Sequence, residues 1–298
     1  MPWPADHPLC TDPTLRPFTA AATELAAGYR VLSVLRYLPG RRVATLLEGP
    51  GRRAVLKVFA SPRARGNHRR LTMLAASTAA SIVPTSLGTD DAGHVHLVSY
   101  HPGVELDRLP DADFVSGCES AGVQLRRLHD SGALFDRSWG WTEEASQLER
   151  QAVPTTLAAV CEVLGDPPPA GGADWVSAHR DCHPGQMIVG PTGDVRWVDL
   201  DDCTMAPRAL DVGNMVAHLR REHLRGAREL ELVRTAEAQF LCGYQSVAQV
   251  SLDTLDRWTD IATVRLVALA ASRHRDWRLH DRLLAFRSKS AAAARVAG

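Results

Sequence analysis

The stretch of residues 179–202, HRDCHPGQMIVGPTGDVRWVDLDD, limits what this chain can fold into more than any other segment. A carboxylate, Asp181, stands five residues before a carboxamide, Gln186, and a second carboxylate, Asp199, ends an apolar strand after a glycine-containing turn. Carboxylate and amide oxygens are ligands that Mg²⁺ accepts together with phosphate and water. Such a set suits phosphoryl transfer, in which the protein orients an acceptor hydroxyl and holds metal and phosphates while forming few covalent bonds itself.

The first hundred residues are predicted to form a small antiparallel sheet with two helices. Short apolar, β-branched runs alternate with turns at 38–40 and 49–51, a pattern that predicts a meander. The expected strands are residues 30–37, 43–47 and 54–59, followed by a hairpin of 83–87 and 95–100. The expected helices are residues 17–27 and 62–80.

Helical periodicity dominates beyond residue 102. Within residues 123–134, four apolar residues are expected on one helix face: Val123, Leu125, Leu128 and Leu134. A Pro/Gly-rich loop at 166–174 leads into a short β-rich segment at 176–199, and helices are expected from there to the end. The change in pattern predicts two lobes, residues 1–101 and residues 102–298.

Composition excludes several classes of protein. With 45% hydrophobic and 23% charged residues over 298 positions, the chain is neither disordered nor a coiled coil and can bury a large core. The 34 basic residues balance 34 acidic ones, which argues against nucleic acid or an anionic membrane as a partner. The six cysteines form no Cys-x-x-Cys pair, no charged-then-apolar leader opens the chain, and no apolar run reaches the roughly 18 residues of a membrane helix. We therefore expect a soluble, cytoplasmic protein with free thiols.

Lysine is scarce, because only Lys57 and Lys289 stand among the 34 basic residues. Lys57 lies in the middle of a predicted strand, and a compact ammonium is not interchangeable with a guanidinium at a tight phosphate site. Charge is also segmented: residues 41–89 carry nine basic and one acidic side chain, and residues 90–207 carry seven basic and 20 acidic ones. The pattern favours a phosphate-binding N-terminal lobe beside a metal-binding middle. The alternatives are that Lys57 stands there by chance and that the charges only solvate two faces.

Several spaced motifs together resemble those of one enzyme family. HRDCHPGQMIV, WVDLDD and ALDVGN are similar to the catalytic loop and metal-binding segment of the aminoglycoside phosphotransferase and choline kinase-like family. LRYLPGRRVATLL and AVLKVF are similar to its first strands, LVSYHPG to its hinge, and LRRLHDSG to the helix before its catalytic loop. The resemblance implies a bilobal α+β protein-kinase-like fold. An antiparallel-sheet lobe (1–101) would bind the nucleotide, and a mainly helical lobe (102–298) would carry the catalytic loop, the metal site and the acceptor site.

The resemblance also implies roles for individual residues in an ATP- and Mg²⁺-dependent kinase. Asp181 is then the catalytic carboxylate that aligns the acceptor hydroxyl and receives its proton, while Gln186 and Asp199 hold Mg²⁺. Supporting roles without a part in the chemistry fall to His179, Asp201 and Asp211.

Nucleotide-binding residues are expected in the N-terminal lobe. By the resemblance, Lys57 contacts the α- and β-phosphates. Only Gly40 stands between the first two strands, so a glycine-rich phosphate loop is barely present, and Arg41 or Arg42 is expected to cover the phosphates by charge. The adenine is expected to meet the main chain of Val98, Ser99 and Tyr100.

Two departures from the family pattern stand out. Gln186 replaces the usual asparagine, which keeps the amide carbonyl but moves it by one methylene. The family's lysine is normally paired with a glutamate on the following helix, yet no acidic residue lies between Glu48 and Asp90. Lys57 is therefore expected to be positioned by Asn67, by His68 or by the phosphates themselves. A pseudokinase that binds a peptide partner is an alternative.

Other functions are also compatible with the sequence. His179, Asp181 and His183 form an HxDxH triplet that, with Cys182 and Asp199, could hold zinc for a hydrolysis reaction. If the chain is a kinase, its acceptor is expected to be a small hydroxylated natural product or antibiotic, the activity of a resistance enzyme. The alternative acceptor is a Ser/Thr side chain of a ribosomal precursor peptide in lanthipeptide-type biosynthesis. Acidic and aromatic residues that could attract a cationic amino sugar are Trp139, Trp141, Glu143, Glu144 and Glu149.

Overall fold

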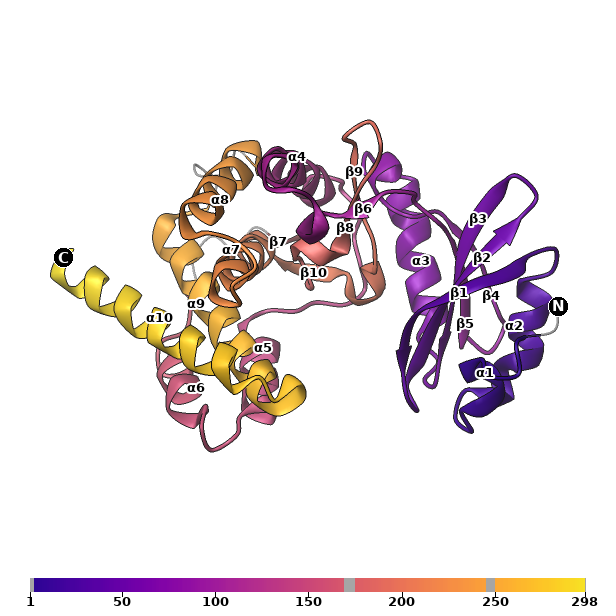
Figure 1. The fold of residues 1–298 in the computed structure, drawn as a ribbon, viewed down its shortest axis with the longest axis horizontal. Coiled ribbons are helices and arrows are strands. Elements are labelled where there is room, and N and C mark those ends of the chain that lie inside the picture. The colour runs from indigo at the N-terminus through magenta and orange to yellow at the C-terminus, as the bar shows by residue number, and fades with distance from the viewer. Residues whose placement is uncertain (1–2, 169–174, 245–249, 298) are drawn as a thin grey trace. The chain divides into compact units, whose positions relative to one another are not determined.

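The computed structural model describes residues 3–168, 175–244 and 250–297, and the chain forms two compact units (Figure 1). The first unit comprises Met1–Gly103 together with a short returning segment, Arg196–Asp201. The second unit comprises Val104–Val195 and Asp202–Gly298. The returning segment carries Asp199 and Asp201 into the first unit, whereas the sequence pattern alone assigns it to the C-terminal lobe.

The first unit is built on the predicted antiparallel sheet, whose five strands follow the order β1-β2-β3-β5-β4. Gly40 and Gly51 turn the chain between its first strands with φ angles of 65° and 70°, which are left-handed values that suit glycine. The strands are β1 (Arg30–Leu38), β2 (Arg42–Gly49), β3 (Arg52–Phe59), β4 (Ser86–Thr89) and β5 (Val95–Ser99). The helices are α1 (Pro8–Thr11), α2 (Thr19–Leu25) and α3 (Ala64–Ala75).

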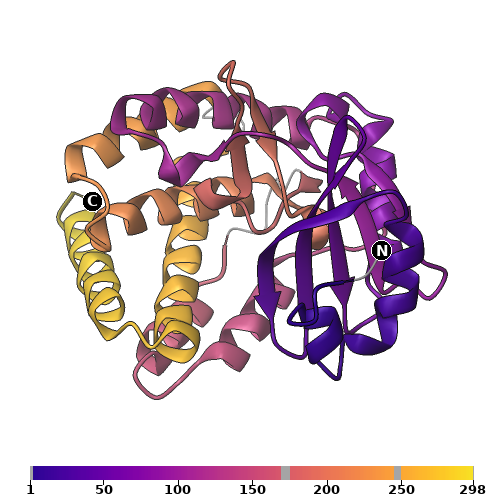
Figure 2. The same cartoon turned by 45° about the vertical axis from the view of Figure 1, so that its right-hand side comes forward.

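The two faces of this sheet have different covers: α1 and α2 lie on one side and α3 on the other (Figures 1 and 2). Because side chains alternate along a strand, Leu56 and Val58 of β3 are buried in the core beside α1 and α2, and Lys57 points to the α3 side. Lys57 pairs with His96 on β5, and the ring of His96 meets the ring of His68 on α3 at 6.2 Å. The Lys57 side chain therefore lies on the face of the sheet that α3 covers.

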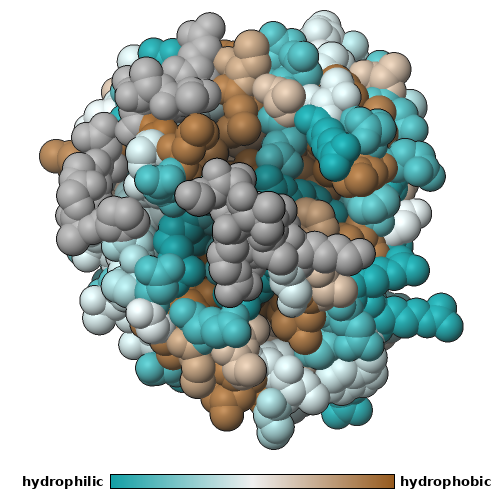
Figure 3. Space-filling view, turned by 90° about the vertical axis from the view of Figure 1, so that its left-hand side faces the viewer, coloured by the Kyte–Doolittle hydropathy of each residue, from teal (hydrophilic) through white to brown (hydrophobic). Residues whose placement is uncertain are grey.

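The second unit is mainly helical. Its helices are α4 (Asp111–His129), α5 (Trp141–Gln151), α6 (Leu157–Leu164), α7 (Arg208–Leu224), α8 (Leu230–Tyr244), α9 (Leu252–Leu269) and α10 (Trp277–Ala297). Two short antiparallel pairs accompany them: β7 (Trp175–Ala178) with β10 (Thr204–Pro207), and β6 (Val104–Glu105) with β8 (Met187–Val189). A last strand, β9 (Val195–Trp197), adds to the second pair to give a sheet of order β6-β8-β9, and the returning segment begins within it, at Arg196. Figure 3, which looks onto the side that is at the left of Figure 1, shows polar and apolar side chains interspersed on this face.

Helices α4 and α8 touch through their main chains. A Cβ at Gly122 would lie 2.1 Å from the Phe240 carbonyl oxygen, and one at Gly243 would lie 2.1 Å from the Glu119 carbonyl oxygen. Neither position has room for a side chain, so glycine allows this close crossing.

The apolar face expected within residues 123–134 is wrong in part. Leu125 and Leu128 are fully buried on α4, but Val123 is 48% exposed. Leu134 lies beyond the end of the helix and is 71% exposed. The helix ends at His129, and Gly132 then takes a left-handed φ of 72°, so the helical periodicity does not continue to Leu134.

The thiols and the helices agree with the expectations from composition. All six cysteines are free thiols. Among the described residues, no helix combines the length and the apolar character that crossing a membrane requires. Most of the loop expected at 166–174 lies outside the described residues.

Candidate active site

The loop that carries Asp181 follows β7 and is braced from below by α7. The buried carboxylate of Asp211 accepts hydrogen bonds from the main-chain N–H groups of His179, at 2.6 Å, and Arg180, at 2.7 Å. His129 Nε2 lies 3.1 Å from the same carboxylate. Burial alone would raise the pKa of Asp211, but the hydrogen bond and charge of His129 hold it below its usual value. Asp211 and the fully buried His179 therefore support the loop, and neither reaches solvent.

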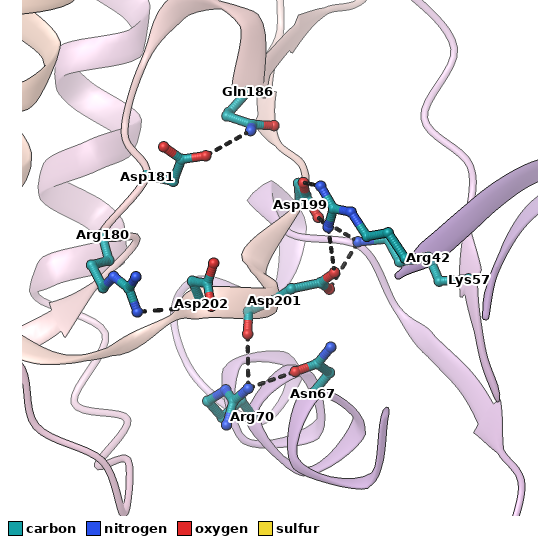
Figure 4. Close-up of polar contacts among 10 residues, drawn as sticks. All are labelled: Arg42, Lys57, Asn67, Arg70, Arg180, Asp181, Gln186, Asp199, Asp201 and Asp202. Atoms are coloured by element: carbon teal, nitrogen blue, oxygen red, sulfur yellow. Dashed lines mark hydrogen bonds and ion pairs between the residues drawn. The ribbon is translucent and has the colours of Figure 1, made fainter. Parts of the chain in front are cut away.

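Asp181 itself presents its carboxylate outward. Its side chain is 52% exposed, and the amide nitrogen of Gln186 donates to its Oδ2 at 3.2 Å (Figure 4). This bond uses Nε2 of Gln186, so it does not occupy the side-chain carbonyl oxygen, which is the atom that would bind a metal ion. His183 accepts from the N–H of Gly185 at 3.1 Å and stacks on His218 at 4.7 Å, so both rings support the turn at Pro184–Gln186.

A chain of buried contacts fixes the main chain on both sides of Asp181. On its C-terminal side, Asn214 donates to the carbonyl oxygen of Cys182 at 2.9 Å, and Arg265 donates to Asn214. Arg265 also donates to Glu144 at 3.0 Å.

The same network returns to the residue before Asp181. Glu144 accepts from the indole N–H of Trp139 at 2.8 Å, and the guanidinium of Arg180 stacks 3.9 Å from the Trp139 ring. Arg180 holds a left-handed φ of 70°, a conformation costing about 1–2 kcal/mol for such a residue that is kept only where the surroundings determine it. The main chain of the loop is thus strained at Arg180, and the contacts of Arg180 with Asp211 and Trp139 hold it in this conformation.

This network corrects one expectation about the acceptor. Glu144 is only 1% exposed and is neutralised by Arg265, so it cannot attract a cationic sugar. Trp139 is held by Glu144 and Arg180. Glu143 is exposed and accepts from the N–H of Gly140 at 2.8 Å. Trp139 and Glu144 therefore serve the structure of the loop.

The first unit gathers a second set of charged groups around Lys57. Its Nζ lies 2.8 Å from Asp199 Oδ1 and 2.8 Å from Asp201 Oδ1 (Figure 4). Arg42 adds ion pairs of 3.2 Å to Asp199 and 3.4 Å to Asp201. Lys57 and Arg42, which are predicted to bind the nucleotide, therefore both form ion pairs with Asp199, the predicted metal ligand, and with Asp201.

Burial and charge oppose each other in this cluster. Burial alone would lower the pKa of Lys57, but the carboxylates of Asp199 and Asp201 outweigh it and raise the pKa above its usual value. Burial also favours the neutral form of Asp199, yet Lys57 and Arg42 hold its pKa well below the usual range. Burial, helped by the charge of Asp199, raises the pKa of Asp201 to about 6.

The expectation that Asn67 or His68 positions Lys57 is wrong. Asn67 Oδ1 instead accepts from Arg70 at 2.6 Å, and His68 Nδ1 lies 2.7 Å from the hydroxyl of Ser86. Arg70 also donates to the main-chain oxygen of Asp201 at 2.9 Å, so α3 reaches the returning segment through a cation rather than an acid.

The turn expected to cover the phosphates is tied down by Asp12. This carboxylate accepts from the N–H of Gly40 at 2.7 Å and from the hydroxyl of Tyr37 at 2.9 Å. The hydrogen bond from Gly40 is the main reason why the pKa of Asp12 is lowered. The N–H of Gly40 is thus already used, and Arg42, which follows the turn, pairs with Asp199 as Lys57 does.

In the segment expected to bind adenine, two main-chain N–H groups already form hydrogen bonds within the protein. The N–H of Ser99 donates to Thr85 at 2.9 Å and that of Tyr100 to Arg53 at 3.3 Å. Val98 is buried in β5. A base that binds here needs a donor other than the N–H groups of Ser99 and Tyr100. A hollow of about 780 Å³ lies nearby, between Tyr29, the β2–β3 turn and Tyr100, and its lining includes none of the Lys57 cluster.

Comparison with known proteins identifies the family. The sequence model of the phosphotransferase enzyme family matches residues 40–237, about two thirds of the chain. The chain belongs to the phosphotransferase enzyme family. No curated protein matches this phosphotransferase.

Solved structures agree on its fold at low identity. An aminoglycoside-3'-phosphotransferase of type VIII is 19% identical with a TM-score of 0.64, over 84% of this chain and 98% of its own. The choline kinase LicA from Streptococcus pneumoniae is 14% identical with a TM-score of 0.64, over 92% and 98%. The amicoumacin kinase hAmiN, solved with AMP-PNP and Ca²⁺, is 14% identical with a TM-score of 0.67, over 91% and 93%. The fold is the protein-kinase-like α+β fold that the motifs implied.

Sequence reasoning missed the residues that hold the site together. Arg70 and Arg265 are two arginines among many, and nothing in their spacing distinguishes them. Glu144 was expected to attract the acceptor, not to support the loop. Asn214 could have been found, because it follows Asp211 by three positions and therefore shares its helix face toward the loop.

Proposed function

We propose that this phosphotransferase transfers the γ-phosphate of ATP, with Mg²⁺, to a hydroxyl group of a small natural product or antibiotic. The observation that carries the proposal is the carboxylate of Asp181, which is half exposed on a loop whose main chain is fixed on both sides. A carboxylate held in this way can orient a hydroxyl and accept its proton as the oxygen attacks phosphorus. The bond from phosphorus to the bridging oxygen of ADP then breaks.

The remaining residues suit the charge of a nucleotide. Lys57 and Arg42 offer two cations for phosphate oxygens. Asp199 offers a carboxylate that is 24% exposed, and Gln186 offers a carbonyl oxygen. Magnesium keeps several waters and needs only one or two protein oxygens, and each of these side chains offers an oxygen, the ligand type that it prefers. When bound, the ion supplies neutralising charge to the phosphates.

The zinc alternative lacks a comparable donor set. Among residues 3–168, 175–244 and 250–297, no three His, Cys, Asp or Glu side chains are grouped to hold a metal ion. Cys182 is fully buried, and burial raises the pKa of its thiol well above the usual value, which disfavours the thiolate that zinc requires.

The nature of the acceptor is supported by the neighbours. The names of the similar structures describe kinases of aminoglycosides, of choline and of amicoumacin, all small molecules. The experiment is a screen for ADP release with aminoglycosides, amicoumacin, choline and a Ser/Thr-rich peptide as acceptors, with Asp181→Asn as the blank. Mg²⁺-dependent turnover of a small molecule that Asp181→Asn lacks supports the proposal. If only the peptide is phosphorylated, the acceptor is a Ser/Thr side chain and not a small molecule. Turnover that survives in Asp181→Asn would overturn the role of Asp181.

A further inference from the structure

Helix α3 gives Lys57 no acidic partner, yet Lys57 has two elsewhere. No carboxylate lies between Glu48 and Asp90 in the sequence. Both partners of Lys57, Asp199 and Asp201, come from the segment Arg196–Asp201. The acids that balance this buried ammonium therefore come from the segment that carries the proposed metal ligand, and not from the helix.

The two carboxylates differ in how firmly they are held. The side chain of Asp199 is 24% exposed, and its main chain has a left-handed φ of 53°. The side chain of Asp201 is 6% exposed, and its main-chain oxygen accepts from Arg70 at 2.9 Å. Arg70 is itself buried, at 4% exposure, and is held by Asn67 at 2.6 Å. Asp199 has access to solvent, whereas Asp201 is anchored to α3.

We propose that Asp201 is the permanent acid partner of Lys57, that Arg70 positions Asp201, and that Asp199 alone exchanges its bond to Lys57 for magnesium. This division rests on the proposed function, because it concerns a site that binds magnesium and nucleotide. Arg70 links α3 to the segment through the main chain of Asp201, and Asp201 in turn holds Lys57. The lysine is thereby coupled to the helix through an arginine and an aspartate.

The physical reason for the division is the cost of a lone buried charge. If both acids turned to the metal, Lys57 would keep a buried ammonium without a counterion, and breaking a buried pair in this way is strongly unfavourable. If Asp201 stays, one acid balances Lys57 and the other is released. Lys57 then keeps its direction while its amine meets the phosphates.

The scarcity of lysine makes a direct test possible. Lys57 and Lys289 are the two lysines of the chain, so modification by an amine-reactive reagent can be followed at Lys57 by mass spectrometry, with the peptide of Lys289 as the reference in the same digest. The variants are Asp201→Asn, Asp199→Asn and Asp201→Glu, at fixed pH and without nucleotide. Asp91→Asn, which removes an exposed acid of the same unit, is the charge-matched control.

We expect Lys57 to react at least about tenfold faster in Asp201→Asn than in the wild type, because the ammonium loses its anchored partner. Asp199→Asn and Asp91→Asn should stay within about twofold of the wild type, and Asp201→Glu should restore most of the protection. Circular dichroism of each variant verifies that it is folded. Equal acceleration in Asp199→Asn and Asp201→Asn, or none in Asp201→Asn, would overturn the division of roles.

A binding measurement separates this inference from the proposed function. By calorimetry with Mg²⁺ and a non-hydrolysable ATP analogue, Asp201→Asn should bind the nucleotide at least about tenfold more weakly while its affinity still rises with Mg²⁺. Arg70→Lys should weaken binding less than Arg70→Met does. If the wild type binds no nucleotide, the proposed function fails, and the modification experiment still tests the partner of Lys57. If Asp201→Asn binds as the wild type does, the inference fails and the function stands.

Discussion

Among single residues, Asp181 is the one whose removal should separate chemistry from binding. Asp181→Asn keeps the shape of the side chain but cannot accept the proton of the acceptor, so kcat should fall by about 10²–10⁴-fold. Nucleotide affinity should stay within about twofold, because the proposed nucleotide contacts are Lys57, Arg42 and Asp199. Steady-state kinetics and calorimetry on the same preparation measure both quantities. A variant that turns over normally would show that Asp181 is not the base.

Individual residues were predicted from the sequence where their chemistry is rare. Lys57 was singled out because lysine is scarce, and the structure places it 2.8 Å from Asp199, which was singled out independently. The partner of Lys57 was not predicted, because the family pattern places it on the following helix, where this chain has no acidic residue. Asp201 is distant from Lys57 in sequence, and only the return of Arg196–Asp201 to the first unit brings it near. The roles of these residues in binding remain predictions.

At the scale of elements, the buried ion pair between α5 and α9 should stabilise the second unit. Glu144 and Arg265 are 1% and 10% exposed, so Arg265→Met leaves a buried carboxylate without its partner and should lower the free energy of unfolding by about 3–5 kcal/mol. Urea denaturation measures this loss, and kcat should fall with it because the support of Asp181 is lost.

The matched control is an ion pair on the surface. Glu231 and Arg234 on α8 are 81% and 65% exposed, and Arg234→Met should change stability by less than about 1 kcal/mol. Equal effects of Arg265→Met and Arg234→Met would contradict the structural role of the buried pair.

The crossing of α4 and α8 gives a second prediction for elements. Gly122→Ala would place its Cβ against the main chain of Phe240, which cannot move aside as a side chain can. We expect a loss of about 2–4 kcal/mol in unfolding free energy, beyond the usual gain of alanine in a helix. Val123→Ala, at the exposed neighbouring position, should cost less than about 0.5 kcal/mol. Thermal unfolding of both variants checks the difference, and a stable Gly122→Ala would contradict the close crossing.

Elements were predictable where local signals agree. Alternation and glycine turns placed β1, β2 and β3 within two residues of their observed ends. The strand predicted at 83–87 begins later, at Ser86, and its pairing is shifted between Ser86 and Gly88. The periodicity of α4 was extended too far, because the turn at Gly132 was not recognised.

For the whole molecule, buried neutral histidines should make stability depend on pH. Burial is the main reason why the pKa values of His7 and His218 are lowered and that of His96 falls to about 3. The unfolded chain binds these protons below about pH 6.5 and the folded chain does not. Stability is therefore full above that pH and is lost as the pH falls toward the folded pKa values, by roughly 1.4 kcal/mol per pH unit for each histidine. Urea denaturation at about pH 8 and pH 5 tests this, and His96→Gln should reduce the slope. Equal stability at both values would contradict it.

The change in sequence pattern predicts two lobes, but it does not predict that a later segment of the chain returns to the first unit. The change from β-rich to helical sequence lies near residue 102, and the first unit extends to Gly103. The return of Arg196–Asp201 is six residues long, and no pattern of charge or periodicity marks so short a segment. It nevertheless decides which unit carries Asp199.

The most direct test of magnesium-dependent nucleotide binding is a magnesium titration of ATP binding, by calorimetry or thermal shift, on the wild type and Asp199→Ala side by side. We expect ATP to stabilise the wild type in a Mg²⁺-dependent manner and Asp199→Ala to lose this dependence, because the variant lacks the carboxylate proposed to hold the ion. Mg²⁺-dependent binding that persists undiminished in Asp199→Ala, or no response to ATP in the wild type, would contradict it.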